Sequence, residues 1–251
     1  MDKYIYFLIK IFDEDEHAEM FLDGILHSKK ISYFRKLYDE AEGNRGDRHE
    51  GVISWYKAEE LKIEINGVTL KDVVGNVSIK MNSHDNVNIF CLYASYQTEN
   101  FELTQENIPK LIEQLKISES CLGLGRKAVI VTNVQEFMNR VLNKADQQQL
   151  DLRAGLIEYY DPKIFSGKFT DDDAIFKKRI EFSHQKEYRF AFYPNNISDD
   201  AINLDIGNIR DIAFKMEANE INNEIKISKI AQWAKQKILI SGDLYIVRRQ
   251  S

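Results

Sequence analysis

The feature that most constrains the fold is a nine-residue run at residues 88–96, Asn-Ile-Phe-Cys-Leu-Tyr-Ala-Ser-Tyr, which is almost entirely apolar. A strand of this composition is expected to be buried on both faces, in the centre of a sheet. A second run, residues 188–192, alternates aromatic residues with Arg189 and Ala191. This period of two places one set of side chains on each face of a sheet. The chain is therefore expected to fold around a sheet that contains both runs.

Further strands and helices follow from the same periodicities. Strands are expected at residues 4–12, 31–37, 63–65, 68–70, 77–81, 127–131, 156–160, 209–216 and 244–248. Asn66-Gly67 separates two of them as a two-residue hairpin turn. Apolar residues at helical spacing predict helices over residues 18–25, 108–115 and 134–142 and around residues 230–234. Short strands with irregularly placed helices predict an α+β fold with mixed, largely antiparallel sheets and peripheral helices.

Composition narrows the class of protein. The chain has 251 residues with 3 prolines and no Gly/Ser-rich linker, which predicts one domain over residues 1–251. A net charge of -6 argues against coating nucleic acid by charge alone. Two cysteines are too few for a disulfide framework or a zinc site, and no apolar run reaches the roughly 20 residues that span a bilayer. We expect a cytoplasmic protein with no membrane partner and no structural metal.

The sharpest chemical arrangement is the pair Gln185 and Glu187, at the start of the strand over residues 188–192. Two residues apart on extended backbone, an amide and a carboxylate point the same way and could address one ligand together. The alternative is that Glu187 pairs with Arg189 on a solvated face of the sheet.

Two other segments carry candidate ligand-binding residues. Tyr33 and Arg35 share one face of the strand expected at residues 31–37, as an anion clamp or as an ordinary solvated face. Ser95 is small and polar near the end of the central strand, where a ligand could approach. The alternative for Ser95 is a hydroxyl bonded to a neighbouring backbone group.

The polar loop at residues 39–51 holds Asp47, His49 and Glu50, which are residue types that bind metals. No second histidine or cysteine lies at a spacing that would complete a ligand set, so no metal ligand is predicted in this sequence. Glycines at residues 123–125 precede a strand, whereas a phosphate loop lies between a strand and a helix, so a phosphate loop is rejected there.

Several quoted segments carry a resemblance. They are residues 31–35, the sequence Gly-Asp-Arg-His-Glu-Gly at residues 46–51, residues 89–95, residues 125–140, and residues 176–190 with Lys177, Phe182 and Gln-Lys-Glu-Tyr-Arg at 185–189. In this order, over about two thirds of the chain, they resemble a widespread, mostly uncharacterised bacterial and phage domain-of-unknown-function family related to the ADP-ribosyltransferase fold.

The resemblance implies a site that uses NAD as a substrate. Glu187 would stabilise the positive charge that builds on the ribose, and Gln185 would orient the acceptor. Arg35, with Tyr33 beside it, would grip the diphosphate, and Ser95 would hold the ribose or shape the pocket. The sequence departs from the usual Ser-Thr-Ser, because only Ala94-Ser95-Tyr96 is present, and its arginine lies in Tyr-Phe-Arg.

Three functions follow in order of preference. The first is a mono-ADP-ribosyltransferase that modifies a protein or nucleic acid acceptor, as a toxin, defence effector or phage-encoded modifier. The second is a non-catalytic interaction or inhibitor protein that keeps the fold, suggested by the acidic balance and the exposed loops at residues 39–51 and 161–173. The third is a metal-dependent nuclease that uses Asp47, His49, Glu50 or Glu187.

Overall fold

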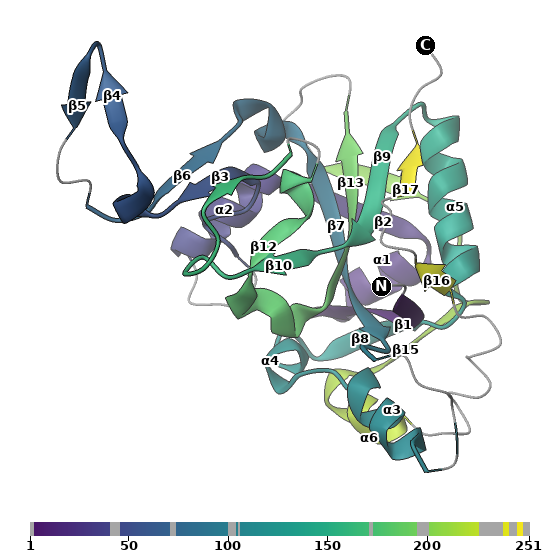
Figure 1. The fold of residues 1–251 in the computed structure, drawn as a ribbon. Helices are drawn as coiled ribbons and strands as arrows, with labels where there is room; N and C mark the ends of the chain where they lie inside the picture. The colour runs from purple at the N-terminus through teal and green to yellow at the C-terminus, as the bar shows by residue number, and fades with distance from the viewer. Residues whose placement is uncertain are drawn as a thin grey trace. The chain divides into compact units, whose positions relative to one another are not determined.

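The structure is a computed structural model that describes residues 3–40, 46–70, 74–99, 104, 106–170, 173–194, 201–225, 238–240 and 245–247 (Figure 1). The chain divides into two compact units. The larger unit comprises Met1–Lys29, Asn88–Leu156 and His184–Ser251, and the smaller unit comprises Lys30–Val87 and Ile157–Ser183. A domain can contain two compact units, so one domain over residues 1–251 stays a prediction.

The larger unit is built on one sheet. Its main path is β15 (Ala213–Glu217), β8 (Lys127–Val131), β1 (Lys3–Phe12), β7 (Asn88–Tyr96), β13 (Glu187–Tyr193), β9 (Asp151–Leu156) and β17 (Tyr245–Val247). Off this path are β2 (Ile25–Lys30), which pairs with β7 and β14 (Ile202–Asp205), and β16 (Ile238–Ile240), which pairs with β1. The apolar run at residues 88–96 is thus the central strand that the sequence predicts.

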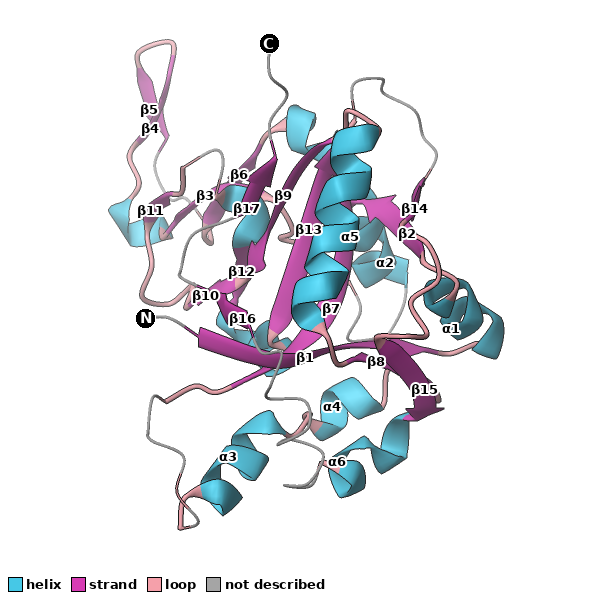
Figure 2. Cartoon of the chain, turned by 90° about the vertical axis from the view of Figure 1, so that its right-hand side faces the viewer, coloured by secondary structure: helices cyan, strands magenta, loops and turns pink. Residues whose placement is uncertain are grey.

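Helices cover both faces of this sheet. Figure 2 shows α5 (Val134–Gln147) lying along one face, and α1 (Asp15–Leu22) packs into the same hydrophobic core. There the ring of Phe21 in α1 packs against Phe90 of β7 and against Phe137 of α5. The opposite face carries Tyr93 and packs with α3 (Ile108–Leu115), α4 (Glu119–Leu122) and α6 (Ile221–Glu224). Because successive side chains of β7 point to opposite faces of the sheet, this strand contributes residues to the hydrophobic cores on both faces.

Local signals explain where α5 begins. The side-chain oxygen of Asn133 accepts a hydrogen bond from the backbone N–H of Glu136 at 3.0 Å, which satisfies a donor that the first helical turn leaves open. From Val134 the buried residues recur at helical spacing, so one stripe of the helix faces the sheet.

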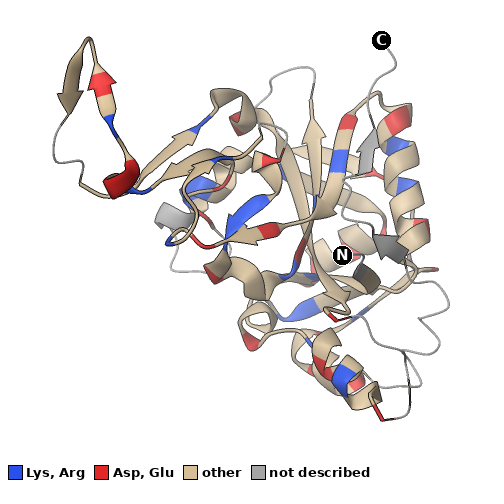
Figure 3. Cartoon of the chain, viewed as in Figure 1, with Lys and Arg blue, Asp and Glu red and all other residues tan. Residues whose placement is uncertain are grey.

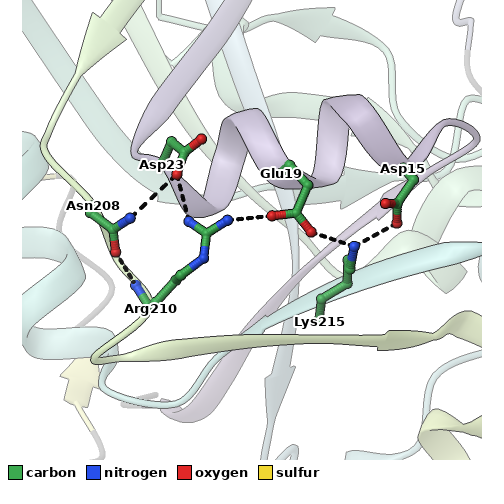
Figure 4. A network of polar contacts seen from close by, with 6 residues as sticks. All are labelled: Asp15, Glu19, Asp23, Asn208, Arg210 and Lys215. Atoms are coloured by element: carbon green, nitrogen blue, oxygen red, sulfur yellow. Dashed lines mark hydrogen bonds and ion pairs between the residues drawn. The ribbon is translucent and has the colours of Figure 1, made fainter.

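A network of charges fastens α1 to the segment around β15 (Figure 4). Arg210 bridges Glu19 and Asp23, and the Arg210–Asp23 contact is 2.5 Å. Lys215 bridges Glu19 and Asp15, at 2.6 Å to Asp15. These side chains are substantially exposed, so each pair contributes little alone, and their value lies in linking two segments distant in sequence.

The smaller unit contains a three-stranded sheet in the order β11 (Gly167–Lys168), β3 (Val52–Tyr56) and β6 (Val77–Lys80). A separate hairpin joins β4 (Ile63–Ile65) to β5 (Val68–Leu70), and β10 (Glu158–Tyr160) pairs in parallel with β12 (Lys177–Arg179). Its helix is α2 (Ile31–Glu40). The smaller unit also contains the 3-10 helices η1 (Ala58–Glu60), η2 (Asn82–Asn86) and η3 (Ala174–Phe176). The 3-10 helix η4 (Ile180–Gln185) begins in the smaller unit and ends in the larger one, which also contains η5 (Ala218–Glu220).

The fold-class prediction is confirmed as α+β with largely antiparallel sheets. The hairpin at Asn66-Gly67, the central strand and the strand over residues 188–192 are all present. The strand expected at residues 156–160 is two strands, β9 and β10, and that expected at 209–216 is β15, which begins later. The last strand is β17, and the helix expected around residues 230–234 lies outside the described residues.

One predicted strand is wrong. Residues 31–37 belong to helix α2, and the strand of that region is β2, which ends at Lys30. Ile, Tyr and Phe favour strands, and that preference suggested alternation. In the structure Ile31 is buried and Tyr33 is exposed, because apolar Ile31, Phe34 and Leu37 are three residues apart and form one side of a helix.

Candidate functional site

The larger unit holds a buried ion pair at the start of β13. Arg189 donates a hydrogen bond from Nε to one carboxylate oxygen of Glu187 at 2.7 Å, and its Nη2 lies 2.6 Å from the same oxygen as an ion pair. Arg189 is fully buried and Glu187 is 5% exposed. The pairing foreseen as one alternative therefore exists, but the side chains are buried and the face is not solvated. A buried guanidinium favours the ionised form of the carboxylate beside it.

The residues opposite this pair come from β7. The antiparallel register places Glu187 opposite Tyr93 and Arg189 opposite Cys91. Burial, followed by the negative charge of Glu187, raises the pKa of the Cys91 thiol to about 12. Cys91 is therefore a neutral thiol, poorly suited to act as a nucleophile.

Ser95 lies on the same face of β7, two residues beyond Tyr93. A residue two positions beyond the opposite partner is a diagonal neighbour about 7 Å away, so Ser95 and Glu187 come near each other. The Ser95 hydroxyl donates to the backbone oxygen of Leu115 at 2.7 Å, and the side chain is fully buried. The bonded serine foreseen as an alternative is what the structure shows.

Gln185 does not lie on extended backbone. It is the last residue of η4, and Lys186 has a φ of 38°, in the left-handed region, before β13 begins at Glu187. The prediction that the Gln185 and Glu187 side chains point the same way assumed extended backbone at both residues. That assumption is wrong, because Gln185 ends a 3-10 helix and Lys186 has a positive φ. Lys186 is anchored instead, because its Nζ donates to the backbone oxygen of Gln114 at 2.7 Å.

Arg35 and Tyr33 belong to the smaller unit and lie on helix α2. The Arg35 guanidinium pairs with the Asp85 carboxylate, and its Nη1 donates to the backbone oxygen of Glu50 at 3.1 Å. Tyr33 is 39% exposed and its ring meets Phe34 edge-on. The arginine thus already pairs with one carboxylate through Nη2, while its Nη1 bonds to a backbone oxygen.

The smaller unit carries a second concentration of charge, at the turn that contains Asp47, His49 and Glu50. The Asp47 carboxylate accepts from the backbone N–H of His49 at 2.8 Å. Lys178 of β12 lies 3.7 Å from the Glu50 carboxylate, and both are nearly buried. Buried charges of opposite sign at this spacing hold a turn in place, and they are also common at functional sites.

His49, in the same turn, has a pKa that is strongly shifted by its surroundings. Burial, followed by the positive charges of Arg179, Lys80 and Arg48, lowers the pKa of its imidazole to about 4. The ring packs edge-on against Trp55, with centroids 5.1 Å apart. His49 is therefore neutral near pH 7. Across the described ranges, no group of three or more His, Cys, Asp or Glu side chains could hold a metal ion.

Of the sequence-predicted residues, the fold brings Glu187 and Ser95 together on one sheet face of the larger unit. The predicted shared face of Tyr33 and Arg35 is wrong, because both lie on helix α2 of the smaller unit and residues two apart on a helix point to different sides. The sequence did not predict that Arg189 is fully buried, or that Lys178 pairs with Glu50. The signal for Arg189 was its position in an otherwise aromatic strand. Lys178 carried no signal, because it is one of three consecutive cations.

No helix among the described residues has the length and apolar character that crossing a membrane requires. Comparison with known proteins finds no matching family model, no matching curated protein and no matching solved structure.

Proposed function

We propose that this chain is an NAD-consuming mono-ADP-ribosyltransferase in which Glu187 is the catalytic carboxylate. The observation that carries the proposal is the fixed position of Glu187, which Arg189 holds through two contacts of 2.6 and 2.7 Å at the start of β13. A carboxylate fixed before the reaction starts stabilises developing positive charge without reorganisation. The short, mostly antiparallel strands and the order of the quoted segments also support an ADP-ribosyltransferase-like fold.

The chemistry requires an anion beside the ribose. When the bond between the ribose C1′ and the nicotinamide nitrogen breaks, nicotinamide leaves with the bonding electrons and positive charge remains on the ribose. Glu187 would stabilise this charge, and a nucleophilic atom of the acceptor would then bond to C1′ and lose its proton to solvent. Ser95, a diagonal neighbour of Glu187, would shape that end of the site through its bond to Leu115.

The remaining predicted residues receive narrower roles in this proposal. Within the smaller unit, Arg35 would bind phosphate oxygens in place of the Asp85 carboxylate, and Tyr33, which is exposed on the same helix, would be accessible to a ligand. In the larger unit, Gln185 would orient the acceptor. The acceptor class is a protein or a nucleic acid, as expected of a toxin, a defence effector or a phage-encoded modifier.

Transfer of label from NAD tests the proposal. The wild-type protein incubated with labelled NAD and cell lysate should label a macromolecule. Glu187→Gln, which keeps the shape and removes the charge, should reduce labelling about 100-fold or more. Glu113→Gln is the matched control, because Glu113 is 73% exposed and pairs only locally with Lys116. No labelling by the wild type, or equal labelling by Glu187→Gln, would overturn the proposal; circular dichroism shows that each variant is folded.

A second function is favoured by a specific observation, namely that three predicted site residues already have protein partners. Arg35 pairs with Asp85, Ser95 with the Leu115 backbone, and Glu187 with Arg189. We propose as the alternative that the chain is a non-catalytic interaction or inhibitor protein. This alternative predicts no NAD-dependent rise in melting temperature, whereas the first function predicts a rise that Arg35→Lys diminishes.

A further inference from the structure

Three buried polar atoms of the smaller unit lack a hydrogen-bond partner among the described residues. They are Nδ1 of His49, the hydroxyl oxygen of Tyr160 and Nε of Arg179. A buried donor or acceptor without a partner lowers the stability of the fold, so native proteins contain few of them. Groups that cost stability and are nevertheless present are common at functional sites.

The three atoms belong to one cluster. The parallel register of β10 and β12 pairs Tyr160 with Arg179, so these two side chains lie side by side on one face of the ribbon. Burial, followed by the charge of Arg179, lowers the pKa of the His49 imidazole. Burial, followed by the charge of Asp47, raises the pKa of the Tyr160 hydroxyl. Because such effects require neighbouring charges, the turn that carries Asp47 and His49 lies close to the ribbon.

The side chains of this cluster are held in place. In the turn, the backbone N–H of Glu50 donates to the backbone oxygen of Asp47 at 3.1 Å, and the Asp47 carboxylate accepts from the backbone N–H of His49 at 2.8 Å. On the ribbon, the Tyr160 ring contacts Phe169, with centroids 5.0 Å apart. A site built on such fixed elements is preorganised for its ligand.

The hydrogen-bond donors and the surrounding charges suit an anion. Nε of Arg179 can only donate, and the Tyr160 hydroxyl keeps its proton because its pKa is raised. Nδ1 of a neutral imidazole also donates in one of its two tautomers. Arg48 and Lys80 add positive charge beside His49. An oxyanion could therefore accept a hydrogen bond from each of the three atoms.

Two buried carboxylates of the turn are already neutralised or bonded. Glu50 lies 3.7 Å from Nζ of Lys178, and Asp47 accepts from the backbone of His49. β12 itself has the sequence Lys-Lys-Arg and is basic along its length (Figure 3). The negative charges of the turn are thus offset, and an added anion would meet a basic strand.

Arg179 uses only half of one guanidinium edge. Its Nη2 lies 2.5 Å from the carboxylate of Glu181, which is 51% exposed, whereas the neighbouring Nε has no hydrogen-bond partner in the described part of the chain. Nε and Nη2 together form an edge that binds two oxygens of one anion. The Arg179 side chain is 16% exposed, so the edge opens to solvent when the Glu181 carboxylate moves away.

We propose that Arg179, Tyr160 and His49 form a binding site for a phosphoryl group, which takes the place of the Glu181 carboxylate on Arg179. A phosphoryl group has three terminal oxygens for three donors, whereas a carboxylate has two, and arginine binds phosphate through two parallel bonds. The group belongs to inorganic phosphate or to a phosphate monoester. NAD carries no phosphate monoester, so this site is separate from the proposed transfer chemistry.

Thermal unfolding with added anions tests the site. Sodium phosphate and AMP at about 1 to 20 mM should each raise the melting temperature more than sodium chloride of equal ionic strength does. A larger rise with AMP assigns the site to a monoester, and an equal rise assigns it to free phosphate. Arg179→Gln should remove the rise. Lys62→Gln, the same loss of charge at a side chain that is 74% exposed, should retain it.

Two further variants have effects of opposite sign on binding, measured by isothermal titration of phosphate. Tyr160→Phe removes a donor and should weaken binding by about 3-fold or more. Because it also removes a buried hydroxyl without a hydrogen-bond partner, it should raise the melting temperature of the protein in the absence of phosphate. Glu181→Gln removes the competing carboxylate and should tighten binding by about 3-fold or more.

Four outcomes would overturn the inference. They are no rise with either anion beyond that with chloride, a rise that Arg179→Gln retains, a rise that Lys62→Gln also loses, and weaker binding by Glu181→Gln. A lower melting temperature of Tyr160→Phe without phosphate would likewise contradict it, because the hydroxyl would then support the fold. Folded Glu187→Gln should bind phosphate as the wild type does, so this site stands or falls independently of the transferase proposal.

Discussion

Arg189 holds the carboxylate of Glu187 from within the same strand: its Nε donates to one Glu187 oxygen at 2.7 Å, and its Nη2 lies 2.6 Å from that oxygen. The two residues are next-but-one neighbours on β13, so the alternation of the strand places them on one face. The Glu187 carboxylate is almost completely buried, so water cannot solvate its charge, and the Arg189 guanidinium stabilises that charge instead.

Removing one partner of this pair should be costly. Arg189→Met leaves the Glu187 carboxylate buried without its guanidinium and should lower the free energy of unfolding by about 3 to 5 kcal/mol. The double variant Glu187→Gln, Arg189→Met should lose clearly less than the sum of the two single variants, because they share one interaction. Urea unfolding of all four proteins measures this coupling. Additive losses would show that the pair contributes nothing as a unit.

Ser95→Ala should affect stability through a single hydrogen bond. The variant removes the donor that satisfies the Leu115 backbone oxygen in a fully buried position. We expect the free energy of unfolding to fall by about 1 to 3 kcal/mol. Ser120→Ala, at an exposed position on α4, is the matched control and should change it by less than about 0.5 kcal/mol. Similar losses in both variants would contradict a structural role for the Ser95 hydroxyl.

His49 should make stability depend on pH. Its pKa falls to about 4 in the folded protein, mainly because burial disfavours the imidazolium, while an unfolded histidine titrates near 6.5. Between these values the unfolded state binds more protons. The contribution of His49 is therefore fully present above about pH 6.5 and is lost progressively as the pH falls toward about 4.

The measurement is the unfolding free energy of wild type and His49→Asn between about pH 4.5 and 7.5. Carboxylates titrate in both proteins, so the difference between them isolates the histidine. The stability advantage of the wild type should grow as the pH rises. An advantage that is constant with pH, or that grows toward acid, would show that His49 is not held in its neutral form.

Gly24 should tolerate no side chain. It has a φ of 94°, and a Cβ atom built on it would lie 1.9 Å from the backbone oxygen of Gly207, which cannot withdraw as a flexible side chain could. Gly24→Ala should therefore cost more than about 2 kcal/mol or prevent folding. Gly123→Ala is the control, because its nearest contact is 3.7 Å. Thermal unfolding that gives equal midpoints for both variants would be inconsistent with this packing.

The parts of the fold that sequence predicted well are those set by local pattern. The apolar run at residues 88–96 and the alternation over residues 188–192 each match the period of the strand they form. The Asn66-Gly67 turn needs two positive φ angles, which only a few residue types supply readily. Helix α2 was missed because its aromatic and β-branched residues favour strands, and tertiary packing of Ile31 outweighed that preference.

The candidate site was less predictable because it depends on which surfaces become covered. Sequence allowed Glu187 to pair with Arg189 but did not show that the pair is buried, since burial depends on elements distant in the chain. The bond between Ser95 and Leu115 joins a strand to a helix, and no local pattern specifies it. Arg35 could not be placed correctly once its segment was assigned to a strand, because the two structures orient successive side chains differently.

Nicotinamide release from NAD by the purified protein tests the central claim most directly, because it requires no knowledge of the acceptor. The account predicts time-dependent release by the wild type and by the exposed-site control Glu113→Gln, with release reduced about 100-fold or more in folded Glu187→Gln. Release that is undiminished in folded Glu187→Gln, or no release and no NAD binding by the wild type, would contradict the assignment of Glu187 as the catalytic carboxylate.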